Sequence, residues 1–240
     1  MATATDCLFR EDAYLKECSA TVVGFLDNGI VLDRTVFYAA GGGQPGDHGV
    51  LTIPAGEPIL VETAVYSDPS KSVVVHIPAD SASGRPDIGA PVHALIDWER
   101  RYARMRMHTA LHLLSAVLPY PVTGGSVGEN EGRLDFDIPE AGLDKDDITR
   151  KLAKIIAADA EVRARWITDE ELLAQPSLVK TMAVKPPIGT GRVRLIEIVG
   201  YDLQPCGGTH VHRTGEIGAV RVTQIEKKGK QNRRVRLAFA

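Results

Sequence analysis

The first hundred residues alternate between short apolar runs and turn residues, which is typical of a β-rich segment. In ATVVGFLDNGIVLDRTVFY two β-branched runs flank LDNG, and Asn28-Gly29 is a strong hairpin signal. The short runs GVLTI, LVETAVY, KSVVVHI and VHALID follow, with a loop rich in proline, glycine and serine before the last. Many short strands separated by turns predict a small β-barrel, and this region has no convincing helical period.

From Asp97 the apolar positions recur at helical spacing. The stretch DWERRYARMRMHTALHLLSAVL predicts a long helix that ends at two following prolines. The expected buried stripe of this helix is Met107, Leu111, Leu114 and Leu118.

A second helix is expected over residues 146–168, in DDITRKLAKIIAADAEVRARWIT. Its expected apolar face is Ile148, Leu152, Ile155, Val162 and Trp166. Thr168 followed by Glu171 resembles a capping box and predicts a short third helix. Strand patterns then return to the end of the chain. We therefore predict an α+β fold, with a small N-terminal β-barrel domain over residues 1–95 and an α+β domain over residues 96–240.

Composition narrows the class of protein. The chain has 240 residues, 44% hydrophobic and 25% charged, and no apolar run approaches the roughly 20 residues of a membrane span. The N-terminus lacks a signal-peptide pattern, and three scattered cysteines make no disulfide framework, so we expect a cytoplasmic protein. Cys7 and Cys18 are expected to be plain buried thiols. With a net charge of −3, any nucleic-acid role must rest on local basic patches.

The candidate chemistry lies in two segments far apart in the chain. His108 and His112 are four residues apart in HTALH, so both project from one face of the predicted helix. LQPCGGTHVH adds Cys206 and His210, and its glycines let the backbone fold around an ion. Three imidazoles and one thiol are the donors that zinc prefers, so we predict one Zn²⁺ per chain. A zinc protease would have glutamate where Thr109 stands, so protease chemistry is not expected.

Each half of this set has a simpler explanation when it is taken alone. The two helical histidines suit the edge of a core, and Cys206 suits a buried thiol. His212 is an alternative to His210 as the fourth ligand. The remaining histidines, His48, His76 and His93, are expected on the surface or in loops.

Taken together, these segments resemble a known family. HTALH, GGSVGENEGRLDFDI and QPCGGTHVHRTGEIG are similar to the editing domain of alanyl-tRNA synthetases and to the free-standing alanyl-tRNA editing proteins called AlaX. VFYAAGGGQPGDHG, residues 36–49, resembles the glycine-rich motif of the longer AlaX forms, which carry an N-terminal β-barrel. Ala39-Ala40 departs from that motif, which usually begins with proline, while the core from Gly41 to Gln44 is intact.

The resemblance implies hydrolysis of the ester that joins a wrong amino acid, serine or also glycine, to the 3′ end of alanine tRNA. It carries over His108, His112, Cys206 and His210 as the metal ligands. The chain is too short to include a synthetase catalytic domain and has no ATP-binding motif of one. Two alternatives stay open, a non-catalytic zinc-stapled tRNA-binding module and an editor of another tRNA such as threonine tRNA. The sequence leaves the oligomeric state open.

An editing site must remove serine and spare alanine. A pocket can do so by hydrogen-bonding the serine hydroxyl, because alanine would leave the same buried polar groups unpaired. We expect a small polar pocket near the metal, with Thr123, Ser126 and Gln44 as candidates, although each could simply cap a turn. The resemblance adds the loop of Gly41, Gly42 and Gly43 as the place where alanine tRNA is distinguished.

Catalysis at a labile ester needs a positioned water and donors for the oxyanion. The backbone N–H groups of Gly207 and Gly208 are candidate donors, as are those of residues 41–43. Asp47 and Asp135 are weaker candidates for orienting water.

Two basic segments are candidates for tRNA phosphates. RRYARMR begins the metal-binding helix, where solvated, salt-bridged arginines are nearly as good an explanation. KKGKQNRRVR has glycine and asparagine that interrupt a strand and predict an exposed loop. In this second segment we assign tRNA contacts to Lys227, Lys228, Lys230, Arg233 and Arg234.

Overall fold

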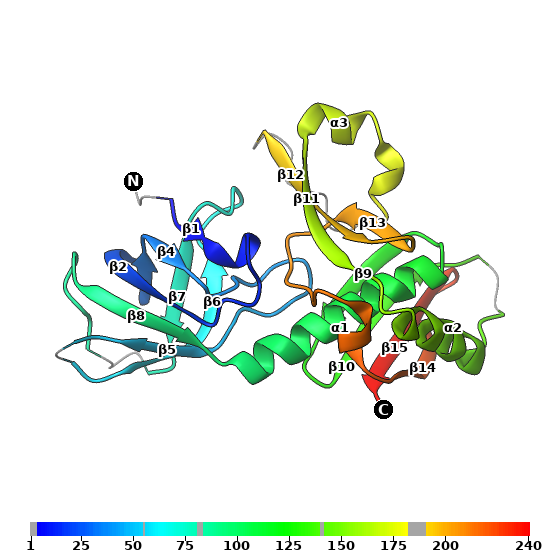
Figure 1. Cartoon of the computed structure of the whole chain (residues 1–240), viewed down its shortest axis with the longest axis horizontal. Coiled ribbons are helices and arrows are strands. Elements are labelled where there is room, and N and C mark those ends of the chain that lie inside the picture. The colour runs from blue at the N-terminus through cyan, green and yellow to red at the C-terminus, as the bar shows by residue number, and fades with distance from the viewer. Residues whose placement is uncertain (1–3, 55, 81–83, 140–141, 182–190) are drawn as a thin grey trace. The chain divides into compact units, whose positions relative to one another are not determined.

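The computed structural model describes residues 4–54, 56–80, 84–139, 142–181 and 191–240. The chain forms two compact units, which are taken separately below (Figure 1). The first contains residues 1–41 and 45–102, and the second contains residues 42–44 and 103–240. No helix in the described ranges is long and apolar enough to cross a membrane.

The first unit is built on a closed six-stranded barrel, as the strand pattern predicted. The strand order around it is β2-β3-β7-β6-β5-β8. The bounds are β2 Glu17–Leu26, β3 Gly29–Leu32, β5 Gly49–Thr52, β6 Ile59–Tyr66, β7 Val74–Pro78 and β8 Pro91–Ile96. A short parallel pair, β1 (Asp6–Cys7) with β4 (Arg34–Thr35), and a 3₁₀ turn at Leu8–Arg10 complete the unit. Alternate strand residues fill the barrel, as the exposed–buried alternation along β8 shows.

The predicted β2–β3 hairpin is present, with its turn one residue earlier than expected. Leu26 pairs with Gly29, so Asp27 and Asn28 form the turn, and Asp27 takes the positive φ of 51°. Gly29 is needed for packing, because a Cβ there would lie 2.2 Å from Val75 Cγ1.

His76 was expected on the surface or in a loop, and this expectation is wrong. It lies fully buried on β7, on the same strand face as core residue Val74. Both ring nitrogens have partners, Thr35 Oγ1 at 2.8 Å from Nε2 and the Ile30 carbonyl oxygen at 3.0 Å from Nδ1. Burial lowers the pKa of His76 to about 4, so the ring is neutral at physiological pH. Cys7 is buried as predicted, and Cys18 is half-buried.

Helix α1, Trp98–Val117, begins in the first unit and continues into the second. Its predicted stripe is buried at all four positions, Met107, Leu111, Leu114 and Leu118. The basic start of α1 is largely internal, because Arg101 and Arg104 are buried and the Arg106 guanidinium donates to the Ile217 carbonyl oxygen. Arg101 and Arg104 are therefore salt-bridged, with Asp47 and Glu129, but they are buried and not solvated as the alternative explanation of RRYARMR expected.

The second unit holds two antiparallel sheets. The four-stranded sheet has the order β14-β15-β10-β9, and the three-stranded sheet has the order β11-β12-β13. The bounds are β9 Val122–Val127, β10 Glu131–Asp137, β11 Val162–Thr168, β12 Arg192–Ile198, β13 Asp202–Pro205, β14 Val220–Lys227 and β15 Asn232–Phe239. Helix α2, Lys145–Ala157, packs on β14, and a 3₁₀ turn at Thr214–Ile217 precedes this strand. The short helix α3, Asp169–Leu173, follows β11, and a 3₁₀ turn at Pro176–Leu178 follows α3.

The predicted second helix is ten residues too long. Helix α2 ends at Ala157, Asp159 takes a positive φ of 49°, and Val162–Thr168 forms strand β11 against β12. Val162 and Trp166 continue the helical spacing of the apolar residues only by coincidence. The local pattern could not show that β12 would pair with this segment. The buried face of α2 is Ile148, Leu152 and Ile156. The capping box at α3 is confirmed, since the Glu171 amide donates to Thr168 Oγ1 at 3.1 Å and the Thr168 amide donates to Glu171 Oε2 at 2.7 Å.

A buried ion pair anchors the first unit. Arg101 and Asp47 are 0% and 2% exposed at their side chains, and Arg101 Nε donates to Asp47 Oδ2 at 2.9 Å. The guanidinium also donates to the carbonyl oxygens of Ala13 and Val36, and the Tyr38 amide donates to Asp47 Oδ2 at 2.7 Å. The pair therefore ties α1 to the backbone at Ala13 and to the glycine-rich segment of residues 36–49, at Val36 and Asp47.

Replacing Arg101 with methionine is expected to lower the free energy of unfolding by about 3–5 kcal/mol, because Asp47 would be left buried and unpaired. Urea unfolding followed by circular dichroism measures this change. Arg163→Met is the matched control, since Arg163 makes an exposed pair with Glu197 and its loss should matter little. Equal, small effects of the two substitutions would contradict the anchoring role.

Candidate metal centre

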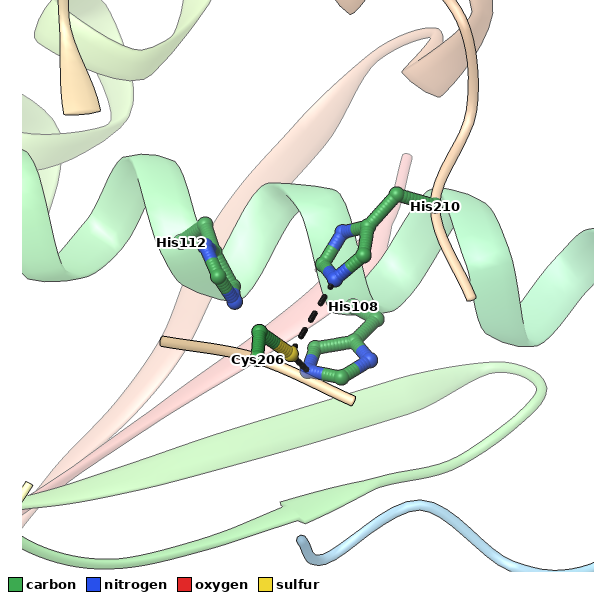
Figure 2. A group of neighbouring side chains, drawn as sticks. All are labelled: His108, His112, Cys206 and His210. Carbon is green, nitrogen blue, oxygen red and sulfur yellow. Dashed lines mark hydrogen bonds between the residues drawn. The ribbon is translucent and has the colours of Figure 1, made fainter. Parts of the chain in front are cut away.

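Four side chains from two distant segments meet in the second unit. His108 and His112 project from α1, while Cys206 and His210 lie in the loop that follows β13 (Figure 2). One donor atom from each of the four lies within 4.8 Å of all the others. The three histidines are buried and Cys206 is half-buried. His212, the alternative fourth ligand, is exposed and lies outside this cluster.

Hydrogen bonds orient the rings of His108 and His210. Nδ1 of His108 is 2.8 Å from Gln44 Oε1, which can only accept. Nδ1 of His210 is 3.1 Å from Thr109 Oγ1, and the Thr109 hydroxyl already donates to the Met105 carbonyl oxygen. Both Nδ1 atoms must therefore carry the proton, which leaves the lone pair on Nε2.

Those lone pairs face the sulfur. Nε2 of His108 is 3.6 Å and Nε2 of His210 is 3.3 Å from Cys206 Sγ. Dashed lines mark these two contacts in Figure 2. Two imidazole lone pairs and a thiol that converge in this way would hold a metal ion between them.

His112 is oriented by a charged network. Its Nδ1 is 3.1 Å from Asp202 Oδ2, and Lys180 Nζ lies 2.5 Å from the other oxygen of that carboxylate. The amide nitrogen of Gln204 donates to Asp202 Oδ2 at 2.8 Å and to Ser115 Oγ at 3.2 Å. A carboxylate behind a histidine fixes the ring and strengthens its other nitrogen as a ligand.

The electrostatics suit a cation. Burial by itself would lower the pKa of His112, but the hydrogen bonds and negative charges of Asp202 and Cys206 together outweigh burial and raise it to about 9. Burial would raise the pKa of the Cys206 thiol, yet the neighbouring imidazoles of His108 and His210 hold it well below its usual value. Burial lowers the pKa of His210, and electrostatic repulsion between the His108 and His210 rings lowers it further. The cluster thus favours a thiolate, the form of cysteine that binds metals.

The glycine loop is shaped by close contacts. A Cβ on Gly208 would lie 2.2 Å from His108 Cε1, so only glycine fits beside that ring. The Gly208 amide points at Cys206 Sγ at 3.4 Å, while a Cβ on Gly207 would meet no atom within 4 Å. Arg194 Nη1 donates to the carbonyl oxygens of Cys206 and Gly208, at 3.0 and 2.9 Å, and so holds the loop from β12.

The sequence reasoning did not identify Arg194, Asp202, Gln204 or Lys180 as part of the centre. Asp202 and Gln204 share one face of β13 and lie just before Cys206, and this alternation is the only local signal they carry. Arg194 and Lys180 act across the fold and have no such signal.

The candidate pocket residues lie in the following places. The Thr123 hydroxyl donates to the Asp135 carbonyl oxygen at 3.2 Å and accepts from Asn232 Nδ2 at 2.9 Å. Ser126 is exposed on β9. Gly41 is in the first unit, where its carbonyl oxygen accepts from the Tyr38 hydroxyl.

Gly42 and Gly43 have φ values of 60° and 84°, which favour glycine, and belong to the second unit. A Cβ on Gly43 would lie 2.7 Å from the Gly125 carbonyl oxygen, and the Val127 amide donates to the Gly43 carbonyl oxygen at 2.8 Å. Gln44 follows directly and is 2% exposed. Residues 42–44 therefore lie between β9 and the metal cluster.

Both carboxylates considered for orienting water have structural partners. Asp47 pairs with Arg101, as described above, and Asp135 pairs with Arg133 and Arg234, each at 2.7 Å. Burial would raise the pKa of Asp135, but these guanidinium groups lower it.

The β14–β15 hairpin carries the predicted basic segment. Lys227, Lys228 and Lys230 are exposed, and Lys228 pairs with Glu226 at 2.7 Å. Arg233 is buried, and its guanidinium donates to the carbonyl oxygens of Gly229 and Asn232. The exposed loop predicted here is present, but Arg233 stabilises its backbone.

Comparisons with known proteins agree with this arrangement. Residues 193–236, which contain Cys206 and His210, match the "Threonyl and Alanyl tRNA synthetase second additional domain", and residues 7–100 match "tRNA synthetases class II (A)". The chain is 35% identical to the alanyl-tRNA editing protein AlaX-M of Methanosarcina barkeri, over 96% of this chain and 97% of that protein. It is also 35% identical to the AlaX-M protein of Saccharolobus solfataricus over the same shares.

A longer relative is the alanine–tRNA ligase of Methanothermobacter thermautotrophicus, 32% identical over 93% of this chain and 25% of that protein. The fold and the His/Cys cluster thus define a member of the alanyl-tRNA editing class. The chain belongs to the family of alanyl-tRNA editing proteins AlaX-M.

Metal affinity is expected to rise with pH. A metal must displace the proton on His112, whose pKa is about 9, so affinity should increase about tenfold per pH unit, or roughly 100-fold from pH 6 to pH 8. Chelator competition at several pH values measures this change. Asp202→Asn removes the carboxylate that raises the pKa of His112, so its pH dependence should be flatter. A wild-type affinity that does not change from pH 6 to pH 8 would refute the assignment.

Proposed function

We propose that this protein is a trans-editing hydrolase that deacylates mischarged alanine tRNA, with serine as the main wrong amino acid and glycine as the second. The observation that carries the proposal is the buried cluster of three oriented histidines and one cysteine, in a chain that matches alanyl-tRNA editing proteins over nearly its whole length. A free-standing editor acts on mischarged tRNA after its release from the synthetase.

The reaction is needed because binding alone separates small amino acids poorly. One methyl group is worth about 1–3 kcal/mol, and an apolar pocket built for alanine cannot strongly reject an added hydroxyl. A second site that hydrogen-bonds the serine hydroxyl favours serine over alanine. Bound alanine would leave the polar groups of that site unpaired.

The proposed cofactor is one Zn²⁺ per chain, held by His108, His112, Cys206 and His210. The donor set fits zinc, because nitrogen and sulfur ligands in this number are typical of that ion. When bound, zinc supplies a Lewis acid that can lower the pKa of water or bind the amino group of the substrate. The chain's own residues orient the donors through Nδ1, and the half-buried Cys206 marks the more exposed side of the cluster.

The proposed oxyanion donors are backbone amides of the glycine loop. The hydrogen bond from the Gly208 amide to Cys206 Sγ makes the Gly207 amide the better candidate. The open space around Gly207 leaves room for a substrate carbonyl.

Thr123 and Ser126 are the proposed residues for recognising the serine hydroxyl, beside the glycine loop of residues 41–43. The Thr123 hydroxyl uses its one proton and one lone pair within the protein, so its second lone pair can accept from serine. Ser126 lies beside the glycine loop, because a Cβ on Gly43 would lie 3.6 Å from Ser126 Cα.

Contacts to tRNA are proposed for Lys227, Lys228 and Lys230, which are exposed in the β14–β15 hairpin. Arg234 is a weaker candidate because of its pair with Asp135, and Arg233 supports the loop from inside.

Reversing the charge of Lys227 and Lys230 should raise KM for the charged tRNA and leave kcat unchanged.

Two other functions have some support. Four protein donors are typical of a closed structural zinc site, which favours a non-catalytic tRNA-binding module. The family model that covers the loop also describes threonyl synthetases, which favours editing of threonine tRNA. The extended similarity to alanyl-tRNA editing proteins makes alanine tRNA the first choice.

The protein is expected to deacylate serine-charged alanine tRNA and to spare the alanine-charged form. Removal of zinc, or His108→Ala, should reduce kcat/KM at least about 100-fold, because the oriented donor set is lost. His93→Ala is the control, since His93 is an exposed barrel residue. Hydrolysis of radiolabelled aminoacyl-tRNA measures both substrates.

Serine release that survives zinc removal would make the metal structural. Binding of tRNA without release of any amino acid would support the non-catalytic tRNA-binding module. A preference for charged threonine tRNA would support the editor of threonine tRNA.

Replacing Thr123 with valine should lower kcat/KM for serine-charged tRNA by about 10–100-fold, because the polar contact to the substrate hydroxyl is lost. The slow rate with alanine-charged tRNA should stay the same, so discrimination falls. Thr223→Val on β14 is the matched control, and thermal unfolding checks that both variants are folded. Equal losses on both substrates would show that Thr123 is only structural.

A further inference from the structure

The Gln44 side chain makes hydrogen bonds to the metal-cluster residue His108 and to Thr209, in the loop that carries Cys206 and His210. Its amide oxygen is 2.8 Å from His108 Nδ1 and accepts from the Thr209 amide at 3.2 Å. Its amide nitrogen donates to Thr209 Oγ1 at 2.8 Å. The side chain is almost fully buried and both of its ends are used within the protein.

The backbone before Gln44 is held as firmly as its side chain. The Gly43 carbonyl oxygen accepts from the Val127 amide, and the positive φ of Gly43 brings its backbone against Gly125. The chain therefore presents the Gln44 amide at a defined place beside α1 and the glycine loop.

His108 depends on this amide for its orientation. His112 and His210 have other partners at Nδ1, Asp202 and Thr109, whereas Gln44 is the partner of His108. On one side the His108 ring lies against Gly208, which has no side chain that could hold the ring in place. Without the amide oxygen, either ring nitrogen of His108 could carry the proton, and the tautomer protonated at Nε2 would direct an N–H at the sulfur.

We propose that Gln44 is the positioning residue of the metal centre. Its amide oxygen fixes the His108 tautomer that turns the Nε2 lone pair toward Cys206. Its two hydrogen bonds to Thr209 hold the loop that carries Cys206 and His210. A neutral amide achieves this without adding a negative charge to a buried site that already contains a thiolate. The inference rests on the zinc binding in the proposed function.

The test compares metal binding by wild type, Gln44→Met and Gln44→Glu. Methionine keeps the volume of glutamine and removes its hydrogen bonds, so zinc affinity should fall about 10–100-fold, as for other partners of ligating histidines. Glutamate keeps an acceptor for His108 Nδ1, and the Thr209 hydroxyl can donate to it. Affinity should therefore return to within about threefold of wild type.

Affinity is measured by competition with a chromophoric chelator. The cobalt-substituted proteins provide a second readout, because the ligand-field and sulfur-to-cobalt bands report the geometry of the donors. The bands of Gln44→Met should shift and those of Gln44→Glu should resemble wild type. Gln224→Met, at an exposed position on β14, is the matched control. Unfolding of the metal-free proteins shows whether a variant has lost its fold.

Zinc affinity and cobalt bands of Gln44→Met that equal those of wild type would overturn the proposal, as would failure of wild type to bind metal. A loss in Gln44→Met without recovery in Gln44→Glu would also overturn the tautomer argument. If wild type binds zinc with the expected variant pattern but releases no serine, the proposed function fails and the role of Gln44 stands.

Discussion

The second unit depends on one constraint, the orientation of three imidazoles toward a single sulfur. Each histidine has its Nδ1 held by an oxygen, from Gln44, Asp202 or Thr109, so that the Nε2 side faces the cluster. Convergent donors repel one another and cost desolvation when no cation is present, so the surrounding hydrogen bonds must hold them in place. The glycine-rich segment, β13 and α1 each supply one of those oxygens, and the site is therefore a property of the whole unit.

Buried polar side chains outside the cluster also have hydrogen-bond or ion-pair partners. His76 fills a barrel position because both of its nitrogens find partners, and Arg101 can be buried because Asp47 and two carbonyl oxygens surround it. In each case a residue that looks hydrophilic in the sequence lies inside because the fold provides complementary atoms. Basic residues near a functional helix are therefore poor indicators of an RNA surface until their partners are known.

Patterns of local origin predicted the elements well. The strands of the barrel, the stripe of α1 and the capping box of α3 follow from side-chain alternation, helical spacing and a three-residue cap, which neighbours in the chain determine. The prediction failed where a strand partner that is distant in the sequence determined the secondary structure. Val162–Thr168 continues a helical spacing but forms β11, because β12 offers a full ladder of hydrogen bonds. The His108–His112 pair and the CGGTH loop were recognised because in each the candidate ligands are only a few residues apart.

The sequence by itself determined the donor types and their spacing, His108 with His112 on one helix turn and Cys206 with His210 around two glycines. It also determined the family, through motifs that extend along the chain. Only the tertiary structure decided which nitrogen of each ring faces the sulfur and which residues hold it there. It also decided that Gln44, 64 positions before His108, supports this site. The physical reason is that a hydrogen bond depends on direction and distance in space, and neither is encoded in the local pattern of polar and apolar residues.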